Sequence, residues 1–159
     1  REKQVYLANP TMQPELDGKS YVVLRQLKPV ARFDILHELA EMGVVPTSMI
    51  DCSDGLASEI IHLCNASNTG ARIFEKNIPI DDETYLSATE FNLSPLTAAL
   101  NGGEDYELVF TVSQKDFEKV EKIADVTAIG YMTDVKNERV LVMKSDQIVD
   151  LTAPGFGEN

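Results

Sequence analysis

The chain is organised around one short segment, Met49-Ile50-Asp51-Cys52-Ser53-Asp54-Gly55-Leu56, in which an apolar run gives way to small polar residues. The apolar run predicts a buried strand, and the apolar spacing that begins at Leu56 predicts a helix. The segment therefore predicts a strand–helix junction carrying two carboxylates, Asp51 and Asp54, with the Ser53 hydroxyl between them. Two such carboxylates repel each other unless a cation lies between them or one of them binds a proton. Hard cations such as Mg²⁺ prefer oxygen ligands of this kind.

The same residues have a second interpretation, as the cap of the helix. Asp and Ser are preferred at helix N-caps, so Asp51, Ser53 or Asp54 could serve only to begin the helix. Taken alone, the segment favours capping, although a cap does not need all three residues. The choice between a cap and a metal site depends on what else the chain places nearby.

A second polar cluster, Asn101-Gly102-Gly103-Glu104-Asp105, precedes an apolar run over 106–112 that predicts a central strand. Paired glycines let a backbone approach a ligand closely and let the next side chain project. The alternative is an ordinary helix end, with Gly102 in the left-handed region and the acids in solvent. If the strands lie together, the two loops could line one cleft that carries Asp51, Ser53, Asp54, Glu104 and Asp105.

The remaining pattern predicts an α/β (α+β) fold in which one mixed β-sheet is covered by helices. A helix is expected over 32–42 with Phe33, Leu36, Leu39 and Ala40 on its inner face, and the helix after Gly55 is expected to expose Ser58 and Glu59. A short helix is also expected from about Tyr21, and further helices are expected to begin at Asp81 and at Ser94-Pro95. Further strands are expected over 71–75, 126–131, 139–143 and 147–150, with 126–131 and 139–143 forming a hairpin. We expect residues 1–30 to be a connection and residues 31–159 to be the domain.

The composition limits the possible partners and compartments. The chain has 159 residues, of which 43% are hydrophobic, and a formal net charge of −12, which disfavours binding to nucleic acid or to an anionic membrane. No apolar run approaches the ~20 residues of a membrane-spanning helix, and no signal peptide is visible. Cys52 and Cys64 are expected to be buried and reduced, which fits the cytoplasm, and His37 and His62 fall on polar helix faces. Because the chain begins at Arg1, we expect it to be part of a longer protein.

The two motifs together resemble a known family. Asp51-Cys52-Ser53-Asp54-Gly55-Leu56 and Gly102-Gly103-Glu104-Asp105-Tyr106-Glu107-Leu108 are similar, in type and order, to motifs in the C-terminal domain of the thiamine-monophosphate kinases. Gly70-Ala71-Arg72-Ile73 and Gly155-Phe156 agree with this resemblance. That family belongs to the aminoimidazole-ribonucleotide synthetase superfamily. The resemblance implies the fold of that superfamily's C-terminal domain and a separate N-terminal ATP-binding domain that this chain lacks.

The resemblance also implies roles for individual residues. Asp51 and Asp54 would hold Mg²⁺ at the ATP phosphates, and Ser53 would contact ATP. Glu104 and Phe156 would contact thiamine monophosphate. The missing domain would supply further metal ligands, most of the nucleotide pocket and a homodimer interface, so we expect this chain alone to be inactive.

The implied reaction is the transfer of a phosphoryl group from ATP to the phosphate of thiamine monophosphate, giving thiamine diphosphate. A phosphate monoester has a second pKa near ~6 and is already a nucleophile at neutral pH, so no general base is needed. Several Mg²⁺ ions would offset the repulsion between two polyanions, which makes an acidic site sensible. Two alternatives remain open: another ATP-dependent enzyme of the same superfamily, and a non-catalytic acidic binding domain.

Overall fold

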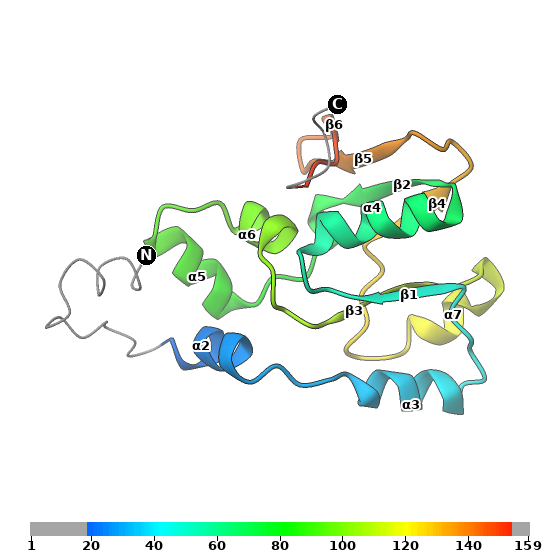
Figure 1. Cartoon of the computed structure of the whole chain (residues 1–159), viewed down its shortest axis with the longest axis horizontal. Helices are drawn as coiled ribbons and strands as arrows, with labels where there is room; N and C mark the ends of the chain where they lie inside the picture. The colour runs from blue at the N-terminus through cyan, green and yellow to red at the C-terminus, as the bar shows by residue number, and fades with distance from the viewer. Residues whose placement is uncertain (1–18, 154–159) are drawn as a thin grey trace, which may run out of the picture.

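A computed structural model describes residues 19–153 and assigns them to two sheets and the helices around them (Figure 1). The α-helices are α2 Ser20–Leu27, α3 Phe33–Glu41, α4 Leu56–Ser67, α5 Asp82–Glu90, α6 Pro95–Asn101 and α7 Phe117–Val120. The strands are β1 Ser48–Asp51, β2 Gly70–Phe74, β3 Leu108–Thr111, β4 Gly130–Thr133, β5 Arg139–Val142 and β6 Ile148–Asp150. Short 3₁₀ helices, η1 Glu75–Asn77 and η2 Gln114–Asp116, follow β2 and precede α7. None of the described helices is long and apolar enough to cross a membrane.

The strands form a mixed arrangement, as the sequence predicts, but they are divided between two sheets. Strands β1 and β3 form an antiparallel pair, and the other four follow the order β4-β2-β5-β6. In the larger sheet β2 and β5 are parallel, whereas β2–β4 and β5–β6 are antiparallel. The predicted central position of β3 is wrong, because among the described residues this strand pairs only with β1 and all of its residues are half-buried.

The predicted hairpin between 126–131 and 139–143 is also wrong. Strand β2 lies between β4 and β5, and the hairpin is formed by β5 and β6 instead. Val140 and Leu141 of β5 are buried, with exposed fractions of 9% and 4%, which is typical of a strand inside a sheet that is covered by helices.

Two apolar clusters hold the elements together. The larger cluster joins α4, α6 and the four-stranded sheet, and its buried members include Ile60, Ile61, Leu100 and Leu141. The smaller cluster lies where α3 and the segment around α7 meet the β1–β3 pair (Figure 1). The two clusters meet the small sheet from different sides, so the ends of β1 and β3 are fixed by packing on both.

Two of the predicted helix faces are wrong in part. In α3, Leu39 is buried as predicted, but Ile35 is buried with it, whereas Phe33 is 65% exposed and Leu36 40% exposed. In α4, Ser58 and Glu59 are buried, with exposed fractions of 4% and 2%. Helix α4 contacts both sheets and α6, so its first turns are covered on more sides than one apolar stripe predicts.

The predicted helix starts at 81 and 94 are confirmed in detail. Asp81 caps α5 by accepting the Glu83 N–H at 2.8 Å, and Ser94 caps α6 by accepting the Thr97 N–H at 3.3 Å. Pro95 occupies the first turn of α6, where its missing N–H costs nothing. The short helix predicted after residue 20 is α2, which packs on α5. Lys19, the residue before α2, forms an ion pair with Glu90 at the end of α5 at 3.0 Å.

Candidate functional site

The two polar loops lie side by side because the strands that carry them are paired. Asp51 at the end of β1 is opposite Leu108 at the start of β3. Beyond this pair the hydrogen bonding continues between the loops: the Cys52 N–H donates to the Glu107 carbonyl at 2.7 Å, and the Tyr106 N–H donates to the Cys52 carbonyl at 2.8 Å. The Glu104 N–H then donates to the Ser53 carbonyl at 2.7 Å. These bonds join residues 51–54 and 104–107 into one unit, which carries the predicted site residues Asp51, Ser53, Asp54 and Glu104.

Glycine allows the two loops to approach this closely. Gly55 has φ +111°, and a Cβ there would lie 2.8 Å from the carbonyl oxygen of Leu100. A Cβ on Gly103 would lie 2.7 Å from the carbonyl oxygen of Ser53. Both distances are too short for a carbon–oxygen contact, so each position requires a residue without a side chain.

The second loop holds two larger residues in the left-handed region. Glu104 has φ +69° and Tyr106 has φ +55°, whereas Gly102, which the alternative interpretation placed in that region, has φ −76°. A non-glycine residue in this region is held against a conformational cost of order 1–3 kcal/mol. Such strain persists only where surrounding contacts fix it, and it is concentrated at functional loops.

The structure contradicts the capping interpretation of the first loop. Helix α4 begins after Gly55, and no side chain caps its N-terminus by a hydrogen bond. The Asp51 and Asp54 side chains are exposed and Ser53 is half-buried. The loop is held instead by Glu59, a buried carboxylate that accepts the Asp54 N–H at 3.0 Å. Sequence reasoning missed Glu59 because its spacing places it on the polar side of an isolated helix.

The carboxylates of both loops act on one phenol, that of Tyr106. Its hydroxyl lies 3.4 Å from Glu104 Oε2. The negative charge of Glu104 raises the pKa of Tyr106, and burial together with the charges of Asp51 and Asp54 adds to that increase. Acidic side chains from two loops that are far apart in sequence therefore raise the pKa of the same phenol.

This arrangement fits a magnesium ion that binds together with phosphate. Among the described residues, no three His, Cys, Asp or Glu side chains are grouped closely enough to hold a metal ion by themselves. Mg²⁺ usually takes only one or two protein carboxylates and completes its shell with water and substrate phosphate oxygens. Asp51 and Asp54 offer exposed oxygens of that type, so the donor set suits Mg²⁺ carried by a nucleotide better than a permanent metal centre.

Neither cysteine is available as a nucleophile. Cys52 lies between the two acids but is 5% exposed, and burial, reinforced by the charges of Asp105 and Glu59, raises the pKa of its thiol to about 12. Burial also raises the pKa of Cys64. Both thiols are free and buried, which confirms the prediction from the sequence.

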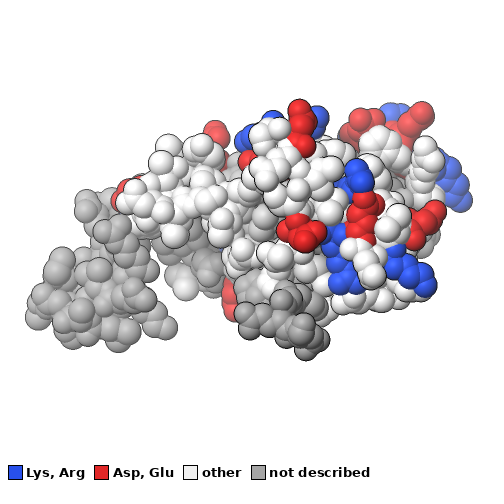
Figure 2. Space-filling model, turned by 90° about the horizontal axis from the view of Figure 1, so that it is seen from above, with Lys and Arg blue, Asp and Glu red and all other residues white. Residues whose placement is uncertain are grey.

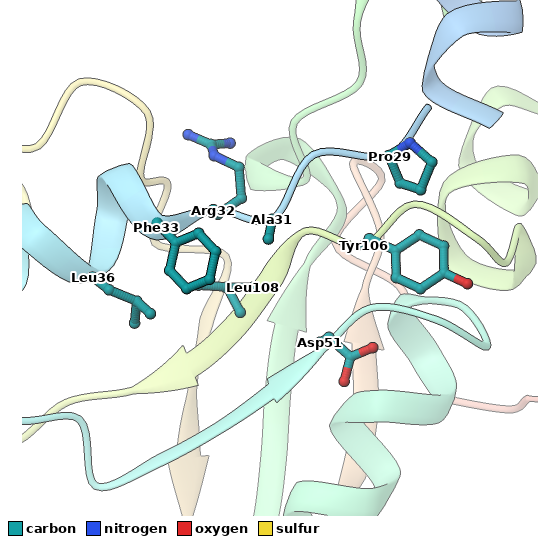
Figure 3. Close-up of a pocket in the computed structure, with 8 residues that line it drawn as sticks. All are labelled: Pro29, Ala31, Arg32, Phe33, Leu36, Asp51, Tyr106 and Leu108. Carbon is teal, nitrogen blue, oxygen red and sulfur yellow. The ribbon is translucent and has the colours of Figure 1, made fainter. Parts of the chain in front are cut away.

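A pocket of about 370 Å³ opens beside Asp51 (Figure 3). Asp51 and Tyr106 lie at one end, and Phe33 and Leu36 of α3 lie at the other. Its remaining lining residues are Pro29, Ala31, Arg32 and Leu108. The exposure of Phe33 and Leu36, which the sequence places in the core, is explained by their position along this pocket.

Two arginines bind the second loop from outside. Arg25 of α2 lies 2.5 Å from one carboxylate oxygen of Glu107 and 3.1 Å from Asp105 Oδ1. Arg32, just before α3, lies 2.7 Å from the other oxygen of Glu107. Sequence reasoning missed this contact because about 80 residues separate the partners and no local motif marks them.

The net charge of the chain is −12. On the face shown in Figure 2, basic and acidic side chains nevertheless lie near one another toward the end away from α5 and α6. The fifth predicted site residue, Phe156, lies outside the described residues.

Comparisons with known proteins agree with the resemblance. The family model for the C-terminal domain of AIR synthase related protein matches residues 10–143. The chain is 34% identical over 136 residues to a thiamine-monophosphate kinase of Buchnera aphidicola subsp. Schizaphis graminum, a match that covers 82% of this chain and 40% of that protein. The chain thus spans about two fifths of the length of that relative.

Solved structures give the same result for the fold. The thiamine monophosphate kinase of Aquifex aeolicus superimposes with a TM-score of 0.70 at 24% identity, covering 96% of this chain and 46% of that one. A structure of AaThiL complexed with AMPPCP and TMP superimposes with a TM-score of 0.67 at 25% identity, covering 91% and 43%. The predicted fold class and the resemblance to thiamine-monophosphate kinases are thereby confirmed.

Proposed function

The chain belongs to the AIR synthase related protein family as a C-terminal domain, and from this premise we propose that it is part of a kinase acting on thiamine monophosphate. In the proposed reaction the bond between the γ-phosphorus of ATP and its bridging oxygen breaks. A new bond forms between that phosphorus and a terminal oxygen of thiamine monophosphate, giving ADP and thiamine diphosphate. The relatives named above are thiamine-monophosphate kinases, and a similar structure holds AMPPCP and TMP.

One observation carries the proposal most directly: among the described residues, the site joins carboxylates from two loops, and its one thiol is buried. Glu104 contacts the Tyr106 hydroxyl, the charges of Asp51 and Asp54 also raise the pKa of Tyr106, and burial raises the pKa of the Cys52 thiol. An acceptor that is itself a phosphate dianion needs no protein base, so a site of this composition suits it. A serine or cysteine mechanism would need an exposed nucleophile beside a base.

The proposed roles follow the exposure and position of each side chain. Asp51 and Asp54 would hold Mg²⁺ at the ATP phosphates, Ser53 contacts the nucleotide, and Glu104 and Phe156 contact thiamine monophosphate. Bound Mg²⁺ supplies charge neutralisation between the two polyanions. The chain's own part is to hold Asp51 and Asp54 in a fixed position relative to Glu104 through the hydrogen bonds between the two loops.

The same proposal covers the rest of the protein. Residues 1–30 connect residues 31–159 to an N-terminal ATP-binding domain, which completes the site and forms a homodimer. The enzyme works in the cytoplasm, without nucleic acid or membrane partners, and the 159-residue chain alone does not turn over substrate. The lengths of the relatives, of which this chain spans 40%, support a larger whole.

The experiment is an acceptor panel with the full-length protein, ATP and Mg²⁺. Thiamine monophosphate, unphosphorylated thiamine and unrelated phosphate monoesters are each incubated, and the products are separated by chromatography. Thiamine diphosphate formation from thiamine monophosphate alone supports the proposal. Turnover of another phosphate ester instead identifies a different enzyme of the superfamily. If calorimetry detects no binding of Mg²⁺ and ATP, the chain is instead interpreted as part of a non-catalytic acidic binding domain.

A further inference from the structure

We propose that Glu107 is a positioning residue that fixes the second site loop by binding Arg25 and Arg32 at the same time. This inference rests on the proposed function for its catalytic consequence, but its structural part can be tested without substrate. Glu107 directly follows Tyr106 and touches neither Asp51 nor Asp54 in the contacts that the structure gives it. Its effect on the reaction would therefore be exerted through the loop.

The contact has the geometry of a two-sided clamp. Oε1 of Glu107 lies 2.5 Å from Arg25 Nη2, and Oε2 lies 2.7 Å from Arg32 Nη1. Each carboxylate oxygen thus accepts from a different guanidinium, and the two guanidinium groups come from opposite ends of the α2–α3 connection. Charge-assisted hydrogen bonds of this kind are short and directional. Arg25 Nη2 also lies 3.1 Å from both the Asp105 carbonyl and Asp105 Oδ1, so the same side chain holds two positions of the loop.

The backbone transmits this anchoring to the site. The Glu107 carbonyl accepts the Cys52 N–H at 2.7 Å, and the neighbouring Tyr106 N–H donates to the Cys52 carbonyl at 2.8 Å. Cys52 lies between Asp51 and Ser53 in the first loop. Glu107, whose side chain is held by two arginines, therefore carries one of the hydrogen bonds that align the loops on its own main chain, directly next to a second one at Tyr106.

The loop needs such an anchor for two reasons. First, Glu104 and Tyr106 occupy the left-handed region, and conformations of that kind relax unless the surroundings fix them. Second, the acidic side chains of the two loops repel one another, which favours separation of the loops. Strands β1 and β3 are four residues long and pair only with each other among the described residues, so the sheet alone gives little resistance.

A purely structural role makes a different prediction. The side chains of Arg25 and Glu107 are 27% and 33% exposed, and ion pairs with that much solvent contact contribute little to global stability. A positioning role therefore predicts a large loss of turnover with a small change in melting temperature. Arg32 is less useful for the test because it also binds Asp34 and Asp125.

The experiment uses the full-length protein with Glu107→Gln, Arg25→Gln and the double variant. Glutamine keeps the size of Glu107 but turns an NH₂ group toward one guanidinium. We expect kcat/KM for thiamine monophosphate to fall at least about tenfold in each single variant, with melting temperatures within about 2 °C of the wild type. We expect the losses of the two single variants not to multiply in the double variant, because both changes remove the Arg25–Glu107 contact.

A matched control is the Arg72–Glu138 ion pair, which joins β2 to the segment before β5 and lies outside the site. Arg72→Gln and Glu138→Gln should leave kcat/KM within about twofold of the wild type. A wild-type kcat/KM retained in Glu107→Gln, or losses that multiply in the double variant, would overturn the catalytic part of the proposal.

Amide hydrogen exchange without ligands separates this inference from the proposed function. We expect the Cys52, Glu104 and Tyr106 amides to exchange at least about tenfold faster in Glu107→Gln than in the wild type, and β2 amides to be unchanged. Unchanged exchange at all three amides overturns the inference whatever the turnover data give. If the wild type phosphorylates no acceptor, the proposed function fails, and the exchange result alone decides whether Glu107 holds the loop.

Discussion

The contact between Gly103 and Ser53 gives the most direct test of the paired-loop site. A Cβ at position 103 would lie 2.7 Å from the Ser53 carbonyl oxygen, where ordinary contact begins at 3.4 Å. In Gly103→Ala the loops must therefore separate by about 0.7 Å, since the opposing atom belongs to the backbone and cannot rotate away. The same carbonyl accepts the Glu104 N–H at 2.7 Å. An equal shift would lengthen this hydrogen bond to about 3.4 Å, beyond the usual range.

The expected magnitudes follow from these two effects. Overpacking costs about 1–3 kcal/mol, and loss of one backbone hydrogen bond costs about 1 kcal/mol. Urea unfolding should therefore report a loss of about 2–4 kcal/mol in the free energy of unfolding. In the full-length protein kcat/KM should fall at least about tenfold, because misplacement of reacting groups by ~1 Å can cost ~10²-fold.

Gly43→Ala is the matched control for adding a methyl group to a glycine. Gly43 has φ +63° and nothing within 4 Å of an added Cβ. The variant should lose about 1–2 kcal/mol from its left-handed backbone alone, with kcat/KM within about twofold of the wild type. If Gly103→Ala has wild-type turnover and loses less than about 0.5 kcal/mol of stability, the loops are not held by this contact and the reasoning is wrong.

Four further predictions concern other parts of the chain. Asp51→Asn should lower Mg²⁺-dependent turnover of the full-length protein at least about 100-fold while shifting the melting temperature by no more than about 2 °C; equal turnover at limiting Mg²⁺ would contradict the metal-binding role. Glu59→Ala should lower the free energy of unfolding by about 2–4 kcal/mol, because it leaves a cavity and an unpaired Asp54 N–H. Glu59→Gln can still accept that hydrogen bond and should lose clearly less of the free energy of unfolding. Equal losses in the two variants would show that the hydrogen bond is unimportant. The hydrogen bond from Arg72 lowers the pKa of Glu138 below its ordinary 4.5. The stabilisation is therefore present above the unfolded-state pKa and is lost as the pH falls through the folded-state pKa. The melting temperatures of wild type and Glu138→Gln should differ at pH 7 and converge toward pH 3, and a difference that stays constant would disprove the linkage. The 159-residue chain alone should form no thiamine diphosphate, and detectable product would refute the need for a second domain.

Local sequence signals predicted several elements accurately. Ser94-Pro95 and Asp81 mark helix starts because a cap needs only a side-chain oxygen and the next few N–H groups. The strand before Asp51 and the helix after Gly55 follow from a change of periodicity within a few residues. These features depend on neighbours in the chain, so the sequence contains all the information that they need.

Features that depend on distant partners were predicted less well. The predicted hairpin between 126–131 and 139–143 does not form, because β2, which lies far upstream in the sequence, is placed between β4 and β5. Glu59 is buried because α4 is covered on several sides, which a single apolar stripe does not reveal. Phe33 and Leu36 line a pocket rather than the core, because α3 packs through Ile35 together with the predicted Leu39.

For the site itself, the sequence determined which chemistry is possible and the tertiary structure determined where it is assembled. The residues between Asp51 and Gly55, and those between Gly102 and Glu107, specify carboxylates and glycines at fixed local spacings, and their order identifies the family. Only the pairing of β1 with β3 brings these loops together, and only Arg25 and Arg32 show that Glu107 is anchored from outside. The physical reason is that side-chain type is encoded one residue at a time, whereas hydrogen bonds across 50 to 80 residues exist only after the chain has folded.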